Sequence, residues 1–288
     1  MKIELPDYVD DLAETVRRAL AEDIGSGDVT SRLVPGAQQA SAHVIARESA
    51  LLCGRPWVDE VFRQLQSTAE LKWHCAEGEQ VEDGQVVLQI RGPARALLTT
   101  ERTALNFLQT LSATATETAR YVSAVAGTGT QIVDTRKTLP GLRNAQKYAV
   151  RVGGGINHRI GLYDGILIKE NHIAAAGGIA AAIAQARALN AGVALMTEAE
   201  SLEEAVVALN ADVDLLLVDD FDDAELREAV RLTRAHRARG GRTLIEYSGG
   251  ATLQRIRALA DTGVDRISIG SLTKHVHAVD LSMRFAST

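Results

Sequence analysis

The chain has 288 residues, 46% of them hydrophobic and 24% charged, and a formal net charge of −6. This composition is ordinary for a soluble globular protein of one large or two smaller domains, and its acidic balance argues against general nucleic-acid binding. No apolar run approaches the ~20 residues of a membrane-spanning helix, and the acidic N-terminus does not fit a signal peptide, so we expect a cytoplasmic protein. Cys53 and Cys75 lack metal-ligand spacing and are expected to be reduced thiols.

The first third of the chain predicts a small α+β unit. Residues 7–22 have helical spacing, with Pro6 and Asp7 at the start. Strand-like runs follow between about residues 40 and 93, and "PWVDEVFRQL" between them is typical of a short helix. The strand-like runs are "AHVIARESALLCG", "ELKWHCA" and "QVVLQIRG".

Residues 94–125 predict a long helical stretch, as one helix or two. Arg102, Asn106 and Gln109 are spaced i, i+4 and i+7, so they form a polar stripe along it. Spacing alone favours a solvated face for this stripe over a functional one.

Beyond residue 130, short apolar runs alternate with helical patterns, which predicts βα units and a parallel sheet. The chain has no dinucleotide-binding fingerprint, so six such units favour a βα barrel with fewer strands than the usual eight. An open doubly wound sheet is the alternative. The six apolar runs are "QIVDTRK", "GILIKEN", "GVALMTEA", "DLLLVDDF", "TLIEYSGG" and "RISIGS".

Polar residues or glycines follow nearly every one of these strands, where the active sites of βα barrels lie. Cations follow the early strands and acids the middle ones. The strand ends carry Arg136 and Lys137, Lys169, Glu198, Asp219, Ser248 to Gly250, and Gly270 with Ser271.

The last two strand ends, "SGG" and "IGS", each precede a helical pattern and expose backbone N–H groups, which predicts a phosphate site. The "GGG" at 153–155 is not part of a dinucleotide-binding motif, and we interpret it as flexible backbone near the site.

Lys169, Glu198 and Asp219 each allow several interpretations. Lys169 follows an apolar run, so it is a snorkelling lysine, an anion-binding cation or a Schiff-base amine. Glu198 and Asp219 could bind Mg²⁺ together with phosphate oxygens, accept hydrogen bonds from sugar hydroxyls, or stabilise a developing cation. The simplest alternative is that both are solvated acids without a role.

The most basic part of the chain is the segment 134–159, whose only acid is Asp134. Arg143, Lys147 and Arg151 within it are spaced i, i+4 and i+8, and they serve phosphates, a subunit contact or only solvent. Because the rest of the chain is acidic, this local charge predicts small anions as ligands.

Several longer stretches together resemble the quinolinate phosphoribosyltransferase family, over almost the whole chain. The segment 134–172 is the most specific of them. The matching stretches are "EDIGSGDVTS", "GPARALL", "ERTALNFLQTLSATAT", "DTRKTLPGLRNAQKYAVRVGGGINHRIGLYDGILIKENHI", "LLLVDDF", "EYSGG" and "ISIGSLTKHVHAVDLSMRF".

The resemblance implies an α/β fold with an N-terminal α+β sandwich-like domain, residues 1–112 joined by the tail 275–288. It also implies a C-terminal open βα barrel of about six to seven strands, residues 113–274. It implies a homodimeric, Mg²⁺-dependent glycosyltransferase of NAD (pyridine nucleotide) biosynthesis. The implied reaction joins quinolinate to 5-phosphoribosyl-1-diphosphate (PRPP) and gives nicotinate mononucleotide, pyrophosphate and CO₂.

The resemblance also assigns site residues. It implies catalytic roles for Lys137, Lys169, Glu198 and Asp219, the last two at the metal directly or indirectly. The quinolinate set would be Arg102 from the neighbouring subunit, Arg136, Lys137, His158, Arg159 and Lys169. The PRPP set would be Glu198, Asp219, Ser248, Gly249, Gly250, Gly270 and Lys274.

Three departures from the family pattern fall on the phosphate and metal side. Met196 stands where a first glutamate of a Glu-x-Glu pair is frequent, Asp220 where asparagine is usual, and Lys274 where some members have histidine. The contact that this histidine makes with phosphate would then be made by Lys274 or by His275. The "SATAT" stretch also differs from a more usual Ser-Gly start.

Three other functions compete with this one. A related enzyme of the same fold would act on another acid, and a Schiff-base aldolase would use Lys169. A binding module for polyanions would be built on residues 136–159, but few aromatic residues accompany its cations.

Overall fold

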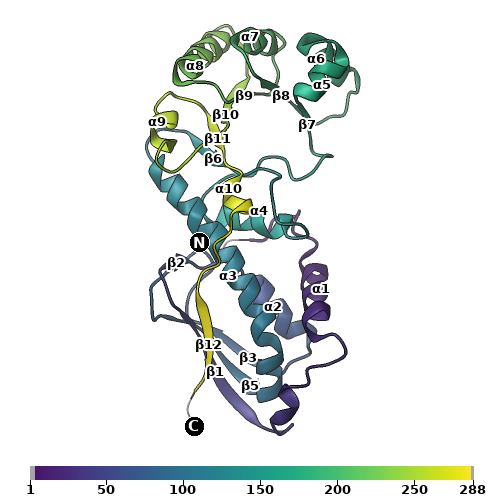
Figure 1. The fold of residues 1–288 in the computed structure, drawn as a ribbon, viewed down its shortest axis with the longest axis vertical. Coiled ribbons are helices and arrows are strands. Elements are labelled where there is room, and N and C mark those ends of the chain that lie inside the picture. Colours follow the sequence, from purple (N-terminus) through teal and green to yellow (C-terminus); the bar gives the residue numbers. More distant parts are fainter. Residues whose placement is uncertain (1–3, 287–288) are drawn as a thin grey trace. The chain divides into compact units, whose positions relative to one another are not determined.

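The computed structural model describes residues 4–286, which form two compact units (Figure 1). Within these residues, unit 1 comprises 4–119, 138–154 and 271–286, and unit 2 comprises 120–137 and 155–270. The predicted domain boundary at 112/113 stays a prediction, and the last two residues of the predicted tail 275–288 lie outside the described residues.

Unit 1 is built on a four-stranded antiparallel sheet in the order β12-β1-β5-β3. The strands are β1 (Gln39–Ala46), β3 (Glu70–Trp73), β5 (Val86–Pro93) and β12 (Leu281–Phe285), and β2 (Ala50–Leu51) pairs separately with β4 (Gln80–Val81). The C-terminal strand β12 lies beside β1, with Val44 opposite Met283 (Figure 1). The end of the chain therefore completes the N-terminal sheet.

The helices of unit 1 share one apolar core with this sheet. They are α1 (Leu12–Ile24), α2 (Arg55–Gln64), α3 (Ala94–Ala124), α4 (Arg143–Val152) and α10 (Ser271–Lys274). Val44 and Leu88 of the strands belong to the same buried cluster as Trp57 of α2 and Leu108 of α3. Burial of this apolar surface is the main stabilising contribution to unit 1.

The predicted first helix begins too early. Residues 7–11 form turns, and α1 starts only at Leu12. Residues 94–124 are one unbroken helix, whose hydroxyl side chains bond back to carbonyls four residues earlier, as Thr118 does to Thr114. Bonds of this kind satisfy the hydroxyls of a buried helix without interrupting it.

Unit 2 contains a six-stranded parallel sheet in the order β6-β11-β10-β9-β8-β7. The strands are β6 (Gln131–Val133), β7 (Gly165–Ile168), β8 (Ala194–Ala199), β9 (Leu215–Asp219), β10 (Leu244–Ser248) and β11 (Arg266–Ser268). Because β6 and β7 end the strand order without pairing to each other, the barrel is open. This confirms the predicted open βα barrel beside a separate α+β unit.

The connecting helices of unit 2 lie outside this sheet (Figure 1). They are α5 (Glu170–Ala176), α6 (Ile179–Ala188), α7 (Leu202–Asn210), α8 (Asp223–Ala238) and α9 (Ile256–Ala260). Inside the sheet, Met196, Leu215 and Leu217 form a small apolar cluster with Leu167 and Leu244. The last of the connecting helices, α9, has only five residues, because turns occupy residues 253–255 before it.

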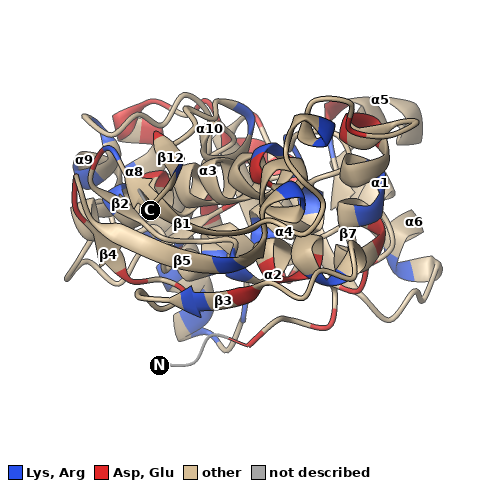
Figure 2. Ribbon diagram, turned by 90° about the horizontal axis from the view of Figure 1, so that it is seen from below, with Lys and Arg blue, Asp and Glu red and all other residues tan. Residues whose placement is uncertain are grey.

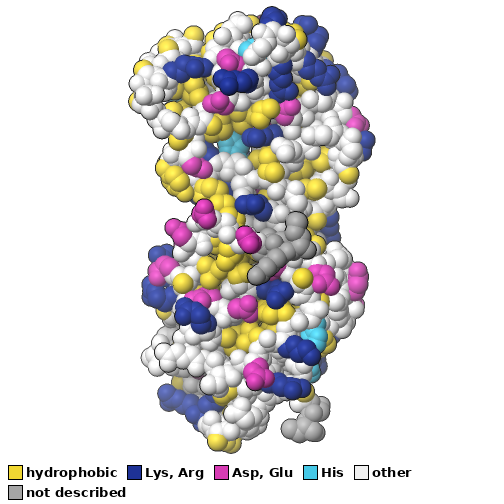
Figure 3. All heavy atoms as spheres, turned by 180° about the vertical axis from the view of Figure 1, so that it is seen from behind, with side chains coloured by type: hydrophobic (Ala, Val, Ile, Leu, Met, Phe, Trp, Pro, Cys, Tyr) yellow, Lys and Arg dark blue, Asp and Glu magenta, His cyan; other side chains and the backbone are white. Residues whose placement is uncertain are grey.

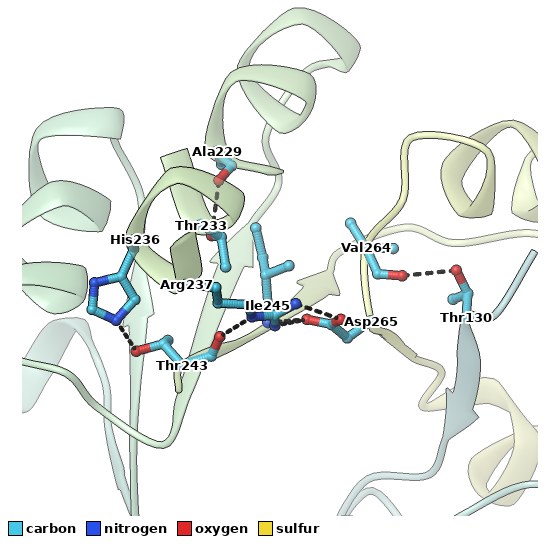
Figure 4. Close-up of polar contacts among 9 residues, drawn as sticks. All are labelled: Thr130, Ala229, Thr233, His236, Arg237, Thr243, Ile245, Val264 and Asp265. Carbon is cyan, nitrogen blue, oxygen red and sulfur yellow. Dashed lines mark hydrogen bonds and ion pairs between the residues drawn. The ribbon is translucent and has the colours of Figure 1, made fainter. Parts of the chain in front are cut away.

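A polar network holds the other end of the sheet, where β10 and β11 begin (Figure 4). Arg237 of α8 forms an ion pair with Asp265 and also donates from Nε to the Thr243 carbonyl, at 2.9 Å. Asp265 accepts the Ile245 N–H at 2.8 Å, and Thr130 Oγ1 donates to the Val264 carbonyl at 2.8 Å. Contacts at this end of a βα barrel contribute to stability, because the chemistry lies at the opposite end.

Charged residues are interspersed along the ribbon, with basic and acidic segments alternating over helices and loops (Figure 2). On the face seen in Figure 3, hydrophobic side chains lie scattered among charged ones. No helix within residues 4–286 has the length and apolarity needed to cross a membrane.

Candidate active site

The C-terminal ends of the six parallel strands bring most of the predicted site residues to one edge of unit 2. Glu198 and Asp219 lie at the ends of β8 and β9, and Ser248 ends β10. Lys169 directly follows β7, and Arg136 lies three residues after β6. Strand polarity therefore produces the site, as the alternation of strands and helices predicted.

Arg136 and Arg159 form a cationic group at this edge. The Arg136 Nε is buried and has no hydrogen-bond partner among the described residues. Burial, and then the charge of Arg136, lower the pKa of the Arg159 guanidinium, whose Nη1 donates to the Gly165 carbonyl at 3.0 Å. Two crowded cations with an unsatisfied donor are matched to an anionic ligand.

Asp134, the single acid of the basic segment, fixes the loop that carries His158. It is fully buried and accepts hydrogen bonds from Asn157 Nδ2 at 2.6 Å and from the His158 N–H at 2.9 Å. Sequence analysis gave it no role, although an acid at a strand end among cations is a usable signal.

Lys137 and Gly270 confirm that the first and last βα units of the chain meet. A Cβ on Gly270 would lie 2.9 Å from Lys137 Cδ, so the lysine stem crosses the glycine closely. The Lys137 N–H donates to Thr135 Oγ1 at 3.0 Å. Gly270 is therefore needed for close packing at this point.

Lys169 and Glu198 are paired with each other, with Lys169 Nζ 2.5 Å from Glu198 Oε1. Burial raises the pKa of the Glu198 carboxyl, and the Lys169 hydrogen bond and charge oppose that shift. A Schiff base needs a free amine at Lys169, whereas Lys169 Nζ is paired with the Glu198 carboxylate, and this contact disfavours the aldolase alternative.

Asp219 is half-buried at the end of β9, and the next residue, Asp220, has a left-handed backbone with φ 53°. Aspartate and asparagine tolerate this conformation better than most residues, so either suits the position. A Cβ on Gly249 would lie 2.1 Å from Asp220 Oδ1, so glycine is required there.

The predicted phosphate loop is present, but not as a helix N-terminus. Gly249 and Gly250 have φ of 121° and 30°, whereas α9 begins only at Ile256 and has five residues. The helix predicted after "SGG" starts late, because turns fill residues 253–255, whereas α10 begins at Ser271 directly after Gly270, as predicted for "IGS". Any phosphate contact here comes from loop backbone N–H groups.

The remaining predicted residues divide between the units. Met196 is buried in the apolar cluster of unit 2, and a Cβ on Gly165 would lie 2.6 Å from its methyl carbon, so this departure from the family pattern is a packing residue. Arg102 is exposed on α3, and Lys274 and His275 are exposed at and after the end of α10, all in unit 1.

The stripe along α3 in unit 1 borders a cleft. Arg102 and Asn106 are exposed and Gln109 is partly exposed. Asn106 lines a cleft of about 340 Å³ together with residues of α1 and Pro140 to Leu142. Gln109 Nε2 donates to the Leu281 carbonyl at 3.4 Å, so only Arg102 and Asn106 of the stripe are exposed to solvent or to a partner molecule.

Two interpretations of the segment 143–155 change. Lys147 of α4 is fully buried while Arg151 is exposed, so the three cations do not share one environment. A Cβ on Gly153 would lie 2.4 Å from the Ala115 carbonyl oxygen, so Gly153 allows α4 to pack closely against α3. Close packing, and not flexible backbone, explains that glycine.

One further acid of this region was not predicted. Glu246, in the middle of β10, is fully buried, and its Oε1 lies 3.9 Å from His158 Nε2. A glutamate within an otherwise apolar strand run is unusual and could have been detected in the sequence.

Comparison with known proteins agrees with this geometry. Residues 28–112 match the model "Quinolinate phosphoribosyl transferase, N-terminal domain", and residues 114–284 match the model of the C-terminal domain. The chain belongs to the quinolinate phosphoribosyl transferase family.

Similar members of the family extend over nearly the whole chain. A Bacillus subtilis protein named "probable nicotinate-nucleotide pyrophosphorylase [carboxylating]" is 40% identical over 94% of this chain and 92% of its own length. A Mycobacterium leprae nicotinate-nucleotide pyrophosphorylase [carboxylating] is 39% identical over 94% of this chain and 95% of its own. The solved Francisella tularensis nicotinate-nucleotide pyrophosphorylase is 40% identical, covers 99% of both chains and has a TM-score of 0.89.

Proposed function

We propose that this chain transfers the phosphoribosyl group of PRPP to quinolinate with decarboxylation, giving nicotinate mononucleotide, pyrophosphate and CO₂ in NAD biosynthesis. The observation that carries the proposal is the cationic group at the strand ends, where the buried Nε of the partly exposed Arg136 is an unsatisfied donor beside Arg159. Membership of the family supports the same reaction.

The two carboxylates of quinolinate suit these cations. Arg136, Lys137, His158, Arg159 and Lys169 would bind them through charge-assisted hydrogen bonds, some bidentate to arginine. Binding of this kind turns the pyridine nitrogen towards the anomeric carbon of the ribose. Such orientation lowers the barrier by several kcal/mol in favourable cases.

The carboxylates of Glu198 and Asp219 suit the transfer of the ribose. As the anomeric C–O bond breaks, positive charge develops on the ribose, and two acids at neighbouring strand ends stabilise it electrostatically. The ring nitrogen becomes quaternary when the new C–N bond forms. Its positive charge stabilises the electron pair left on the adjacent carbon as CO₂ leaves, and a proton from solvent then takes the place of the carboxylate on that carbon.

The donor set at the strand ends fits Mg²⁺ bound jointly with substrate. Among residues 4–286, no group of three or more His, Cys, Asp or Glu side chains could hold a metal ion. The carboxylate of Glu198 already forms an ion pair with Lys169. Mg²⁺ commonly uses one or two carboxylates with phosphate and water oxygens. Asp219 would bind it, with Glu198 acting indirectly, and its chemistry would be neutralisation of the diphosphate charge.

The 5′-phosphate of PRPP suits the glycine-rich strand ends. Backbone N–H groups of Ser248, Gly249 and Gly250 would bind it together with Gly270, because successive amides in a turn form an anion-binding concavity. Lys274 would add a cation to that phosphate, with His275 as the alternative.

We further propose a cytoplasmic homodimer in which Arg102 of one subunit completes the quinolinate site of the other. Exposure of Arg102 on α3 supports a role in contacting a partner molecule. A 1:1 mixture of reassembled Arg102→Ala and Arg159→Ala chains tests it. If the sites are shared, mixed dimers contain one intact site, and about a quarter of wild-type activity returns. No recovery in verified mixed dimers would contradict the shared arginine.

The reaction is tested by incubating the chain with quinolinate and PRPP, with and without Mg²⁺. CO₂ and pyrophosphate should appear in equal amounts and only with quinolinate among pyridine carboxylates. Pyrophosphate release with another acid and not with quinolinate would identify a related enzyme instead. Borohydride trapping of a carbonyl substrate on Lys169 would support the aldolase.

A further inference from the structure

Glu246 lies inside unit 2, level with Glu198 in the sheet register and two residues before the end of β10. The sheet register aligns it with Leu217 of β9 on one side and with Arg266 of β11 on the other. Ser248, at the end of the same strand, follows on the same face two residues later. Glu246 therefore forms part of the floor beneath the candidate phosphate loop.

The carboxylate of Glu246 is poorly compensated. Its side chain is 0% exposed, and neither oxygen accepts a hydrogen bond of normal geometry from the described residues, the only contribution of this kind being a weak one from Ser268. Burial raises its pKa to about 7, with Ser268 and Arg266 opposing the rise and Asp134 and Glu198 adding to it. Buried acids are normally paired or hydrogen-bonded, so this one needs an explanation.

Charged and titratable groups face Glu246 from each neighbouring part of the unit. They are Arg266 on β11, Asp134 after β6, Glu198 on β8 and His158 in the loop before β7. Two of these groups are acids like Glu246 itself. A further anion bound at the strand ends would make an ionised Glu246 still less favourable.

The imidazole of His158 is held with one nitrogen towards Glu246. Its Nδ1 accepts the Arg159 N–H at 2.8 Å, so the ring hydrogen of the neutral form lies on Nε2. That Nε2 is 3.9 Å from Glu246 Oε1, and Asp134 fixes the backbone of the same residue. The ring is thus oriented from both sides, and Glu246 faces the nitrogen that carries the ring hydrogen, so an additional proton on the pair is held by the Glu246 carboxylate.

We propose that Glu246 and His158 form a proton-holding pair beneath the candidate site, so that the dianionic substrate binds together with a proton. Glu246 is a positioning residue here, acting through His158. The pair titrates as a unit, so its titration steps belong to the pair and not to either side chain alone. The inference rests on the proposed function for the identity of the dianion, quinolinate.

The physical reason is charge balance in a buried space. Quinolinate adds two negative charges to a region that already holds Asp134 and Glu198. A proton taken from solvent onto the Glu246–His158 pair removes one negative charge there, and no covalent bond changes. Linkage then requires quinolinate affinity to fall as pH rises through neutral, by at most about tenfold per pH unit for one proton.

Calorimetric titration of quinolinate into the full chain, at neutral pH in two buffers with different protonation enthalpies, counts the protons taken up. We expect up to about one proton per site for the wild type and close to none for Glu246→Gln, whose affinity should be pH-independent over the same range. Glu228→Gln, the same change on the exposed face of α8, should behave as wild type. Equal proton uptake in the wild type and Glu246→Gln would overturn the proposal.

Nitrogen NMR of the His158 ring in the free enzyme separates this inference from the proposed function, because it needs no substrate. The ring titration should shift in Glu246→Gln relative to the wild type, and an unchanged titration contradicts the pair even if quinolinate is the substrate. A shifted titration with no quinolinate binding contradicts the proposed function alone. If Glu246→Gln does not fold, Glu246→Asp keeps a carboxyl in place, and an unaltered pH dependence of binding in that variant overturns the pair.

Discussion

Two carboxylates removed from water, one in each unit, are held in opposite ways. Glu77 in unit 1 accepts hydrogen bonds from the N–H groups of Gly54 and Arg55 at 2.8 and 3.1 Å, at the start of α2. Glu246 in unit 2 has no such bond within the described part of the chain. Burial raises the pKa of both, but backbone donors offset the rise at Glu77.

The difference separates a structural acid from one that serves the site. Glu77 supplies the helix N-terminus with an acceptor for N–H groups that have no partner within the helix, which stabilises unit 1. Glu246 lies among other charges inside the barrel, where an uncompensated acid destabilises the fold. Such a group is consistent with a region arranged for ligand binding and not for maximal stability.

The largest expected effect comes from the core of unit 1. Trp57 is 1% exposed and packs against Tyr148 with ring centroids 5.4 Å apart. Trp57→Ala should lower the free energy of unfolding by about 3–5 kcal/mol, because it leaves a large cavity. Denaturant unfolding measures this, and a loss below about 1 kcal/mol would show that unit 1 is not held by this core.

Substitution of the cations of unit 2 is expected to reduce activity and leave stability unchanged. Arg159→Ala should reduce kcat/KM for quinolinate at least about 100-fold, roughly 3 kcal/mol, because a charge-assisted contact is lost. Thermal unfolding should stay near that of the wild type, and Lys137→Ala should behave similarly. Kinetics like those of the wild type in both variants would remove these residues from the site.

Glu246 should impose a pH dependence on stability. Its pKa of about 7 lies above the ordinary value of 4.5 for a glutamate, so between these values the folded state binds the extra proton. Its contribution therefore falls as pH rises from 4.5 to 7, by at most about 3 kcal/mol, and the penalty is complete above pH 7. Unfolding curves across this range should differ in slope between the wild type and Glu246→Gln. Parallel curves would place the pKa of Glu246 near its ordinary value.

The smallest effect tests the comparison directly. Glu77→Gln should lower stability by about 1–3 kcal/mol at alkaline pH, because an amide cannot accept both backbone N–H groups. Under the same conditions Glu246→Gln should be neutral or stabilising, since it removes a buried charge. If both substitutions destabilise equally, the two acids have the same structural role.

Much of the fold could be predicted from the chain alone. Alternating apolar runs and helical patterns after residue 130 indicated a βα barrel, and the polar ends of those runs indicated its active edge. The start of α1 and the length of α9 could not be predicted, because the apolar spacing continues through residues that turns occupy instead. Propensity is a weak signal at element ends, where tertiary contacts decide.

The sequence by itself determined the residue types at the strand ends and the family to which they belong, because side-chain chemistry and strand order are properties of the chain. Only the tertiary structure decided which charges meet. It paired Lys169 with Glu198, placed Asp134 beneath the His158 loop and set Glu246 opposite the His158 ring. These contacts join residues 24 to 88 positions apart, and no local pattern specifies such distances.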